Sequence, residues 1–182
     1  LYKKSLAIEE KAIGPEHPDV APSLNNLGLL YHNQDRYAEA EPLYIRSLTI
    51  NEKAFGPEHT SVAINLSNLA SLYSDLGRYS EAESLYKRSL SIKEKVLAPE
   101  HPDLAATLHN LASLYETQGR YAEAEPIYKR SLAIFEKAFG PEHPDVAISL
   151  NDLAVLYKDQ GRYSEGEPLF NRAHKINERA FG

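Results

Sequence analysis

A 42-residue repeat runs through the whole sequence and constrains its fold more than any other feature. The tripeptide Pro-Glu-His recurs four times at this spacing, and fifteen of the 42 repeat positions carry one residue type in all four copies. Such chains fold as stacked copies of one unit, because each unit buries its apolar face against its neighbours. Since no linker interrupts the pattern, residues 1–182 are expected to form a single array. Its parts are a partial repeat at 1–14 and full repeats at 15–56, 57–98, 99–140 and 141–182.

Composition excludes several classes of protein. The chain has no Cys, which excludes disulfide scaffolds, thiolate metal sites and cysteine nucleophiles. It has no apolar run of about 18 residues and no signal-peptide pattern, so we expect no membrane span and predict a cytoplasmic location. The net charge of -6 disfavours binding to nucleic-acid phosphates. Because the chain contains no Met at all, we interpret it as a segment of a longer protein.

Each repeat is predicted to contain two helices, of which the first opens at the Pro18-Asp19 pair. Proline suits the first helical position, and an acidic residue there interacts favourably with the helix dipole. Apolar residues then follow at the i, i+4, i+7 and i+11 spacing of one helical face. The helix is expected to end at Asp35, where the other repeats carry Gly, which readily adopts left-handed dihedral angles. The apolar face in the first full repeat comprises Val20, Leu24, Leu27 and Tyr31.

The second helix of each repeat is predicted to begin near Tyr37 and to end at Gly56-Pro57. Three of the four full repeats carry a proline in its second turn, where the loss of a backbone hydrogen bond predicts a local kink. A stripe along this helix is expected to face the core. The stripe residues are Ala40, Leu43, Tyr44, Ser47, Leu48 and Ala54 or Phe55, and the prolines are Pro42, Pro126 and Pro168.

Small residues and tyrosines occupy fixed repeat positions, which indicates that packing dictates them. Gly28 on the first helix and Ala40 on the second have small counterparts in every full repeat, and we expect the two helices to approach closely there. Gly166 is expected to weaken its helix by about 1 kcal/mol relative to Ala. All 12 tyrosines fall in three columns, so we expect them to pack and to leave no platform for stacking nucleobases. The columns begin at Tyr2, Tyr31 and Tyr37.

The motif Leu-x2-Leu-(Gly/Ala)-x2-Tyr, followed by Arg-Tyr-x-Glu-Ala-Glu and a further Tyr, resembles a tetratricopeptide repeat. The 42-residue length and the Gly-Pro-Glu-His-Pro-Asp link between repeats are similar to those of kinesin light chains and their bacterial relatives. The resemblance covers the whole chain and implies an all-α fold, a right-handed α-solenoid of stacked antiparallel helix hairpins. It also implies that the first helices line a concave face and the second helices a convex face.

Two repeated groups of ionisable residues could suggest chemistry, and both are interpreted as structural. Equivalent positions in neighbouring repeats lie about 10 Å apart, too far for His17 and its counterparts to share a metal ion. We expect these histidines to cap helices or to pack on neighbours. Glu39 and Glu41, with their counterparts, lie two apart on a helix and do not face each other. Since phosphate-loop and hydrolase motifs are also missing, we expect no enzyme activity, no cofactor and no metal site.

Binding is expected where polar residues lie on the first helices without a packing reason. Asn is a mediocre helix former, and its amide can both donate to and accept from the backbone of an extended peptide. The alternative is that the second column of these residues bridges adjacent helices, and both roles stay open. In kinesin light chains the matching polar residues contact cargo peptides, although Asp152 departs from Asn and adds a charge. The two columns are Asn25, Ser67, His109, Asn151 and Asn26, Asn68, Asn110, Asp152.

Further groove candidates follow from tetratricopeptide geometry, and they vary among otherwise similar repeats, as a specificity surface should. Ordinary drift at exposed positions is the alternative. Lys93 is included as the only basic residue in the matching second-helix column, and Phe135 as the only aromatic residue outside the aromatic columns. The others are Leu29, His32, Asn33, Ser71, Ser74, Asp75, Ser113, Glu116, Thr117, Val155, Lys158 and Asp159.

The lack of basic residues in one column of the first helices indicates which kind of partner to expect. Kinesin light chains surround their groove with basic residues that receive acidic peptides, whereas the column Pro22, Ile64, Ala106, Ile148 contains no Lys or Arg. We therefore expect a non-catalytic scaffold that binds a partner protein, or a neutral to mildly basic extended peptide, in the concave groove. The alternative is a structural spacer or self-associating array, natural or consensus-engineered, without a dedicated ligand. Uncovered apolar surface on the terminal helices further predicts end-to-end association.

Overall fold

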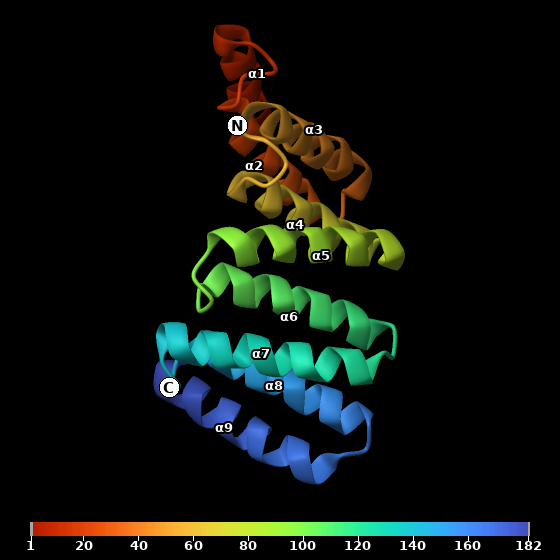
Figure 1. Ribbon diagram of the computed structural model, residues 1–182, viewed down its shortest axis with the longest axis vertical. Helices are drawn as coiled ribbons and strands as arrows, with labels where there is room; N and C mark the ends of the chain where they lie inside the picture. Colours follow the sequence, from red (N-terminus) through yellow and green to blue (C-terminus); the bar gives the residue numbers. More distant parts are fainter. Residues whose placement is uncertain (1, 182) are drawn as a thin grey trace. The chain divides into compact units, whose positions relative to one another are not determined.

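The computed structural model describes residues 2–181, with the side chains of residues 3–180. Every regular element in this range is an α-helix (Figure 1). The chain divides into two compact units, residues 1–96 and residues 97–182. The first unit contains α1 (Tyr2–Ile13), α2 (Val20–His32), α3 (Tyr37–Phe55), α4 (Thr60–Asp75) and α5 (Tyr79–Val96). The second contains α6 (Pro102–Thr117), α7 (Tyr121–Phe139), α8 (Pro144–Asp159) and α9 (Tyr163–Phe181).

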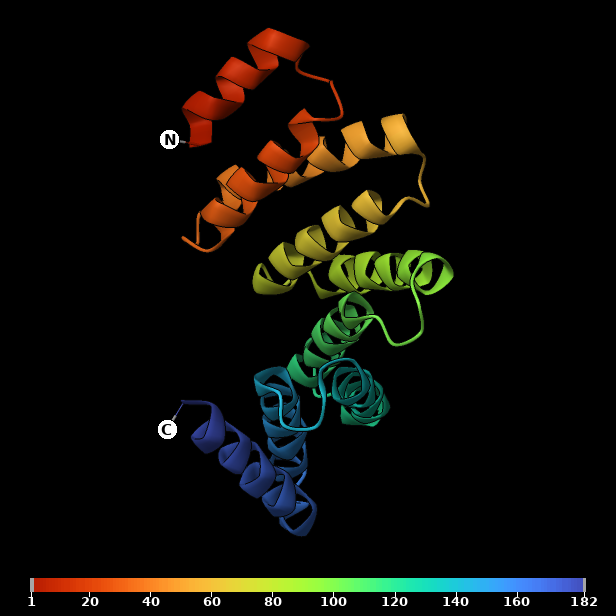
Figure 2. The same ribbon diagram turned by 90° about the vertical axis from the view of Figure 1, so that its left-hand side faces the viewer.

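Each full repeat forms a helix hairpin, as the sequence predicts. α2 packs on α3, α4 on α5, α6 on α7 and α8 on α9, and the neighbouring hairpins of a unit meet through α3 and α4 or through α7 and α8 (Figure 2). The apolar faces of the first helices supply much of the core, where Val20, Leu24, Leu66 and Leu150 are fully buried. The fold is an all-α helical repeat solenoid. Among the described helices, none is long and apolar enough to cross a membrane.

The turn inside each hairpin depends on one residue with a positive φ. Gly77, Gly119 and Gly161 have φ values of 72°, 70° and 73°, a conformation that Gly adopts without steric cost. Asp35 takes this place in the first full repeat with a φ of 56°, and its carboxylate accepts a hydrogen bond from the Tyr37 hydroxyl at 2.9 Å. The predicted ends of the first helices and starts of the second helices are therefore confirmed.

The histidine of every Pro-Glu-His turn accepts a hydrogen bond at the start of the following helix. In His59, His101 and His143 the Nδ1 atom accepts from the backbone N–H two residues later, at 3.2 Å. His17 makes the same contact with the N–H of Asp19 at 3.3 Å. In α4, α6 and α8 this bond satisfies one of the amides that lack an intrahelical partner in the first helical turn, whereas α2 begins at Val20, one residue after the amide that His17 contacts. The structural role predicted for these histidines is confirmed.

Replacing His101 with Ala is expected to lower the free energy of unfolding by about 1 kcal/mol, the usual effect of losing an N-cap acceptor. The His101→Asn variant should recover most of this loss, because it restores a side-chain acceptor at the cap. Urea denaturation followed by far-ultraviolet circular dichroism measures both differences. Equal stabilities of the wild type and the Ala variant would contradict the capping role.

The buried stripe of the second helices ends earlier than predicted. Tyr44 and Ser47 are fully buried, as expected. Phe55, by contrast, is 49% exposed, and its ring stacks on that of His59 with centroids 4.7 Å apart. Ala54 is exposed as well. The prediction for these last two residues was wrong, because the helix ends at this point and Phe55 covers the following turn instead of the core.

Two of the three tyrosine columns are buried, namely those that contain Tyr31 and Tyr44, as far as their side chains are described. Tyr2 lies outside the described side chains. In the third column Tyr163 is 68% exposed, so the prediction that every tyrosine packs was wrong for this residue. Its counterparts Tyr37, Tyr79 and Tyr121, each also the first residue of a second helix, are half-buried.

The small residues lie where the two helices of a hairpin approach most closely. A Cβ atom added at Gly166 would lie 3.0 Å from the carbonyl oxygen of Ala154. One added at Gly28 would lie 2.9 Å from ring atoms of Tyr44. The close contact predicted for these positions is therefore confirmed, and in the last hairpin it involves the backbone itself.

The prolines in the second turns do not interrupt their helices. α3, α7 and α9 each continue through the proline for more than two further turns. The kink expected at these residues stays a prediction, whereas a break in the helix is excluded. The three residues are Pro42, Pro126 and Pro168.

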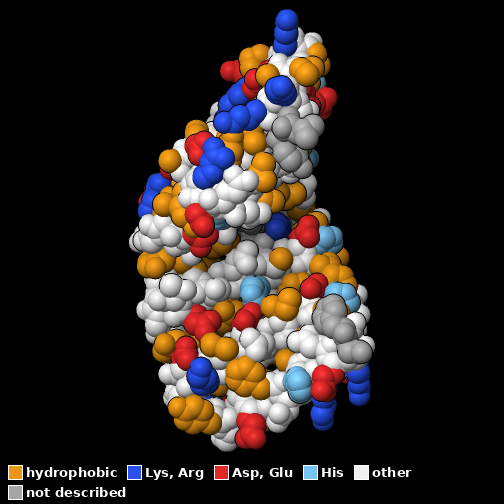
Figure 3. All heavy atoms as spheres, turned by 180° about the vertical axis from the view of Figure 1, so that it is seen from behind, with side chains coloured by type: hydrophobic (Ala, Val, Ile, Leu, Met, Phe, Trp, Pro, Cys, Tyr) orange, Lys and Arg blue, Asp and Glu red, His pale blue; other side chains and the backbone are white. Residues whose placement is uncertain are grey.

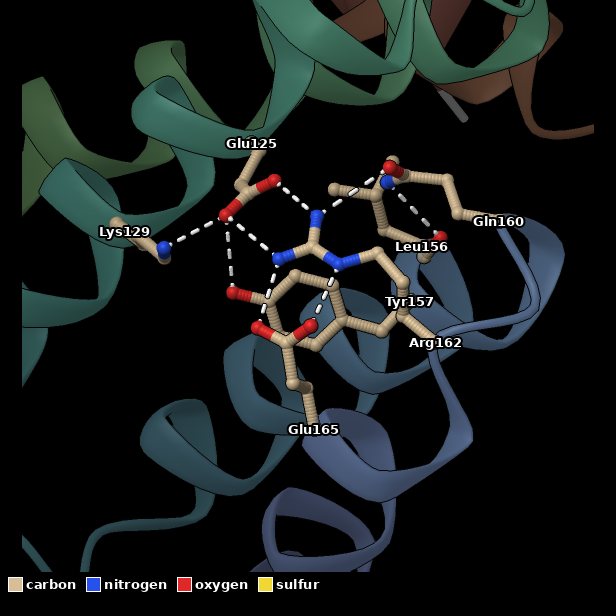
Figure 4. A network of polar contacts seen from close by, with 7 residues as sticks. All are labelled: Glu125, Lys129, Leu156, Tyr157, Gln160, Arg162 and Glu165. Atoms are coloured by element: carbon tan, nitrogen blue, oxygen red, sulfur yellow. Dashed lines mark hydrogen bonds and ion pairs between the residues drawn. The ribbon is translucent and has the colours of Figure 1, made fainter.

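An arginine immediately before the second helix joins neighbouring hairpins within a unit (Figure 4). Arg162 donates to Glu165 at 2.7 Å and to Glu125 of the preceding hairpin at 2.5 Å. Its guanidinium carbon lies 4.3 Å from the ring centroid of Tyr157. These carboxylates therefore stabilise the packing of hairpins, as the structural interpretation predicts. The same contacts recur in the first unit among Arg78, Tyr73, Glu41 and Glu81.

Candidate functional site

A pocket of about 340 Å³ opens between the first helices α2 and α4 of the first unit. Ser47 and Asn51 reach it from the second helix α3 and are themselves buried, so they form its base. Pro22, Ile64 and Phe55 contribute apolar walls. The pocket therefore combines a polar base with apolar sides, which is the usual composition of a ligand-binding cavity.

A chain of hydrogen bonds organises the polar base of this pocket. The side-chain amide of Asn51 donates to Oδ1 of Asn65 at 2.6 Å. The amide of Asn65 donates to Oγ of Ser47 at 2.9 Å and to Oδ1 of Asn25 at 3.1 Å. The amide of Asn68 donates to the same Asn25 oxygen at 2.9 Å. Because these bonds share buried partners, they hold the amides of three helices in one arrangement.

The second unit carries a smaller pocket, of about 140 Å³, at the equivalent repeat position. Every residue that lines it lies two repeats, or 84 residues, after a residue that lines the first pocket. Phe135 stands where the first pocket has Asn51, and it packs against the apolar cluster that contains Leu150. Ser149 replaces Asn65. The two pockets thus share a place in the fold but differ in volume and chemistry.

His109 and Asp152 connect the first helices α6 and α8 beside the smaller pocket. The Nε2 atom of His109 lies 3.2 Å from the carboxylate of Asp152, and its buried Nδ1 has no hydrogen-bond partner among the described residues. Burial lowers the pKa of His109, because desolvation penalises the imidazolium, while the Asp152 carboxylate opposes this shift. Burial also raises the pKa of Asp152, with His109 opposing.

Glu116 lies further along α6 and is half-buried. Its carboxylate accepts a hydrogen bond from the hydroxyl of Tyr128 at 2.6 Å. Burial raises the pKa of Glu116, the hydrogen bond from Tyr128 opposes this shift, and repulsion from Asp152 and Asp159 adds to it. The first helices of the second unit therefore hold several carboxyl groups that interact with one another.

Of the two predicted polar columns, the second divides into two groups. Asn68 and Asp152 each contact a residue of the preceding hairpin, Asn25 and His109 respectively, so the bridging role is confirmed for both. Asn26 and Asn110 are exposed and make no side-chain hydrogen bond among the described residues. These two amides remain free to meet a partner.

Residues of the first column are mostly engaged within the fold. Asn25 belongs to the amide chain described above, and Oγ of Ser67 lies 2.7 Å from Oγ of Ser89 in its own hairpin. His109 contacts Asp152. Asn151 is exposed and hydrogen-bonds to the carboxylate of Asp152. Within this column, Asn25 lines the first pocket and His109 the second.

The further groove candidates also differ in accessibility. His32 and Asp75 form a contact of 2.7 Å between α2 and α4, and Ser71 hydrogen-bonds to the Tyr86 hydroxyl. Lys93 is only 7% exposed. Leu29, Asn33, Asp75, Ser113, Thr117, Lys158 and Asp159 are exposed, and His32, Ser71, Ser74, Glu116, Phe135 and Val155 are half-buried.

Sequence analysis missed Asn51, Asn65 and Ser47 as site residues. Asn65 lies in a column that is polar in every repeat, although Val62, Ala63 and Leu66 beside it are apolar and buried. That signal could have identified it. Ser47 was assigned to the packing stripe, and its hydroxyl does donate to the carbonyl of Ala21 at 2.7 Å, but it also forms part of the pocket base.

Neither pocket is lined by Lys or Arg. On the face drawn in Figure 3, acidic, basic, histidine and hydrophobic side chains are interspersed and form no continuous basic patch among the residues shown in colour. Within the described part of the chain, no group of three or more His, Asp and Glu side chains is placed to hold a metal ion. The arrangement is suited to non-covalent binding through amide hydrogen bonds and apolar contacts.

Comparison with known proteins identifies the family. A family model described as tetratricopeptide repeat matches residues 1–41, 19–95, 77–137 and 103–179, which together cover nearly the whole chain. No curated protein sequence matches the chain significantly.

Solved structures give the same result. A protein of Podosopora anserina, described as a kinesin light chain with nearly identical TPR-like repeats, is 29% identical with a TM-score of 0.80, and the match covers 98% of this chain and 84% of that one. BtubC (BKLC) from P. vanneervenii is 24% identical with a TM-score of 0.87, covering 100% and 72%. A Rap protein complexed with competence and sporulation factor shares the fold at 18% identity, with a TM-score of 0.78 and coverage of 88% and 43%.

Tetratricopeptide repeats are generally non-catalytic modules, and stacked repeats of this kind present extended surfaces to protein or peptide partners. The nine described helices, the pairing of helices in each repeat and the family match agree on this point. The chain therefore belongs to the tetratricopeptide repeat family, in its kinesin-light-chain-like form, and is a protein-interaction scaffold.

Proposed function

We propose that each unit of the chain binds an extended segment of a partner protein, or a peptide, on its first helices, α2 and α4 in the first unit and α6 and α8 in the second. The observation that carries this proposal is the pocket found at the same repeat position in each unit. An unpaired, exposed amide borders each pocket, Asn26 in the first unit and Asn110 in the second. Such a recurring combination suits a ligand that itself repeats, as an extended peptide does.

Amide side chains match the chemistry of a peptide backbone. Every residue of an extended segment other than proline offers one N–H donor and one C=O acceptor. The carboxamides of Asn26 and Asn110 offer the complementary acceptor and donors. The pockets would then receive side chains of the ligand, while the amides hold its backbone.

Charge favours a neutral or mildly basic segment over an acidic one. Asp19 and Asp145 line the two pockets, and no basic side chain lines either. The net charge of the chain is -6. An acidic peptide would therefore meet repulsion without a compensating ion pair, although salt would weaken this effect at exposed positions.

Selection from a library of random extended peptides tests the proposal. We expect sequence-selective binders, and the double variant Asn26→Ala/Asn110→Ala should weaken their binding by about 30-fold, since the two lost hydrogen bonds contribute on the order of 1 kcal/mol each. Isothermal titration calorimetry measures the difference. The control is Ser91→Ala, which changes an exposed polar residue of the second helix α5 and should leave affinity unchanged.

Failure to select any peptide, or unchanged affinity in the double variant, would overturn the proposal and favour the alternative of a spacer or self-associating array. End-to-end association stays a prediction. A pocket of about 270 Å³ on α8 and α9, lined by Ala154, Tyr163 and Phe170 among others, offers apolar surface that supports it.

A further inference from the structure

The pocket of the first unit presents hydrogen-bonding groups that the fold leaves unused. Oδ1 of Asn25 accepts from two neighbouring amides, but the Nδ2 group of Asn25 has no acceptor among the described residues. Asn51 donates to Asn65, but its own Oδ1 accepts no hydrogen bond within the described part of the chain. The side chain of Asn26, on the rim of the pocket, neither donates nor accepts a hydrogen bond among the described residues. A ligand in the pocket therefore meets both N–H donors and C=O acceptors.

The internal bonds decide which groups point to the pocket. Asn65 accepts from Asn51 with its oxygen and donates both amide hydrogens, to Ser47 and Asn25, so it has no donor left for a ligand. Because Asn65 is only 2% exposed, it acts as a fixed support. Their hydrogen bonds to Asn65 orient the side chains of Asn51 and Asn25. The Oδ1 atom of Asn51 and the Nδ2 group of Asn25 then remain as a preformed acceptor and donor for a ligand.

The second unit provides a natural comparison in which this pair is missing. Phe135 replaces Asn51 and Ser149 replaces Asn65 at the equivalent pocket, whose volume is about 140 Å³ against about 340 Å³. The change at this second-helix position accompanies the difference in both the volume and the polarity of the two pockets. In one unit it is an amide acceptor, and in the other an aromatic ring.

Three classes of side chain can be compared as occupants of the first pocket. An aliphatic side chain would leave the amide groups of Asn25 and Asn51 unpaired, which is unfavourable where water is displaced. A carboxylate would find no positively charged side chain in the pocket lining, and the carboxylate of Asp19 would repel it. A carboxamide offers the acceptor and the two donors that the pocket complements, and Pro22 and Ile64 would contact its aliphatic stem.

We propose that the pocket of the first unit is a recognition site for a carboxamide side chain, Gln or Asn, of the bound segment, with Asn51 as the residue that determines this specificity. The inference deepens the proposed function and rests on it for its biological meaning. The chemistry of the pocket can nevertheless be tested without knowledge of the partner.

Side-chain amide NMR spectra of the chain, titrated with N-acetyl-L-glutamine methylamide, test the inference directly. We expect shifts of the Asn25 and Asn51 amide signals and a dissociation constant at least about fivefold lower than for the norleucine and glutamate analogues. Equal binding of the three probes, or shifts elsewhere only, would overturn the inference.

Variants taken from the second unit supply the matched control. The double variant Asn51→Phe/Asn65→Ser reproduces Phe135 and Ser149, a pair that packs in the second unit, and should abolish selectivity for the glutamine probe. The reciprocal variant Phe135→Asn/Ser149→Asn should create a second selective site. Should either double variant fail to fold, Asn25→Ala removes the free donor of Asn25, together with the oxygen that accepts from Asn65 and Asn68, and should reduce selectivity. Unchanged selectivity there would overturn the inference.

The two proposals fail in distinguishable ways. A peptide library that yields selective binders, combined with a pocket that does not prefer the glutamine probe, would overturn the carboxamide inference and leave the proposed function intact. Selective binding of the probe without any peptide binder would support the pocket and overturn peptide binding along the first helices.

Discussion

Replacing Glu125 with Gln is expected to lower the free energy of unfolding by about 2 kcal/mol at pH 7. Glu125 is 19% exposed and accepts hydrogen bonds from Arg162, from Lys129 at 2.6 Å and from the Tyr157 hydroxyl at 3.1 Å. Hydrogen bonds from Arg162 and Lys129 outweigh burial and lower the pKa of Glu125 to about 2, from 4.5. The carboxylate thus stabilises the contact between α7 and the last hairpin.

The pH dependence of this effect has a definite sign. A carboxyl group whose pKa is depressed by folding stabilises the folded state above its unfolded pKa, and the contribution disappears as pH falls through its folded pKa. The difference between wild type and Glu125→Gln should therefore be constant above about pH 5 and vanish near pH 2. Urea denaturation at several pH values measures it.

A neighbouring glutamate provides the control for charge alone. Glu167→Gln removes the same charge from an exposed position on α9 and should change stability by less than about 0.5 kcal/mol. If both variants lose the same free energy, or if the loss in Glu125→Gln does not depend on pH, the network in Figure 4 does not stabilise the packing of the hairpins.

Removing the hydroxyl of a buried tyrosine is expected to change the free energy of unfolding differently at two equivalent repeat positions. Tyr128→Phe should lower the free energy of unfolding by about 2 kcal/mol, because the hydroxyl donates to the carboxylate of Glu116 at 2.6 Å. Tyr44→Phe should leave stability unchanged or raise it by up to about 1 kcal/mol, since the Tyr44 hydroxyl is buried without a hydrogen-bond partner among the described residues. Thermal and urea denaturation measure both changes.

The difference between these tyrosines has a local cause. Leu29 stands where the next repeat has Ser71, which hydrogen-bonds to the Tyr86 hydroxyl. Burial alone raises the pKa of Tyr44 to about 12. The Leu29→Ser variant should therefore make Tyr44→Phe unfavourable, by supplying the missing partner. A loss of stability in Tyr44→Phe equal to that in Tyr128→Phe would contradict this explanation.

Sequence patterns predicted the local structure of this chain well, because local rules govern it. The left-handed position at Gly77 and its counterparts ends each first helix, and the histidine caps begin each following one. The exposed Phe55 and Tyr163 were assigned wrongly, since a hydrophobic side chain near a helix end can cover a turn as well as a core.

The candidate site was only partly predictable. The polar columns of the first helices were recognised, but Asn68 and Asn26, which occupy the same column, have different roles. Periodicity cannot separate them, because the distinction depends on which side chain of the preceding hairpin lies within hydrogen-bonding distance. For the same reason the contribution of Asn65 was missed.

The sequence by itself determined that this chain is an array of helix hairpins, because the spacing of apolar, small and glycine residues within 42 residues allows few other structures. Only the tertiary structure decided which polar groups are consumed by packing and which face the pockets. The physical reason is that a hydrogen bond requires partners within about 3 Å, and residues 43 positions apart in sequence, such as Asn25 and Asn68, meet only when hairpins stack.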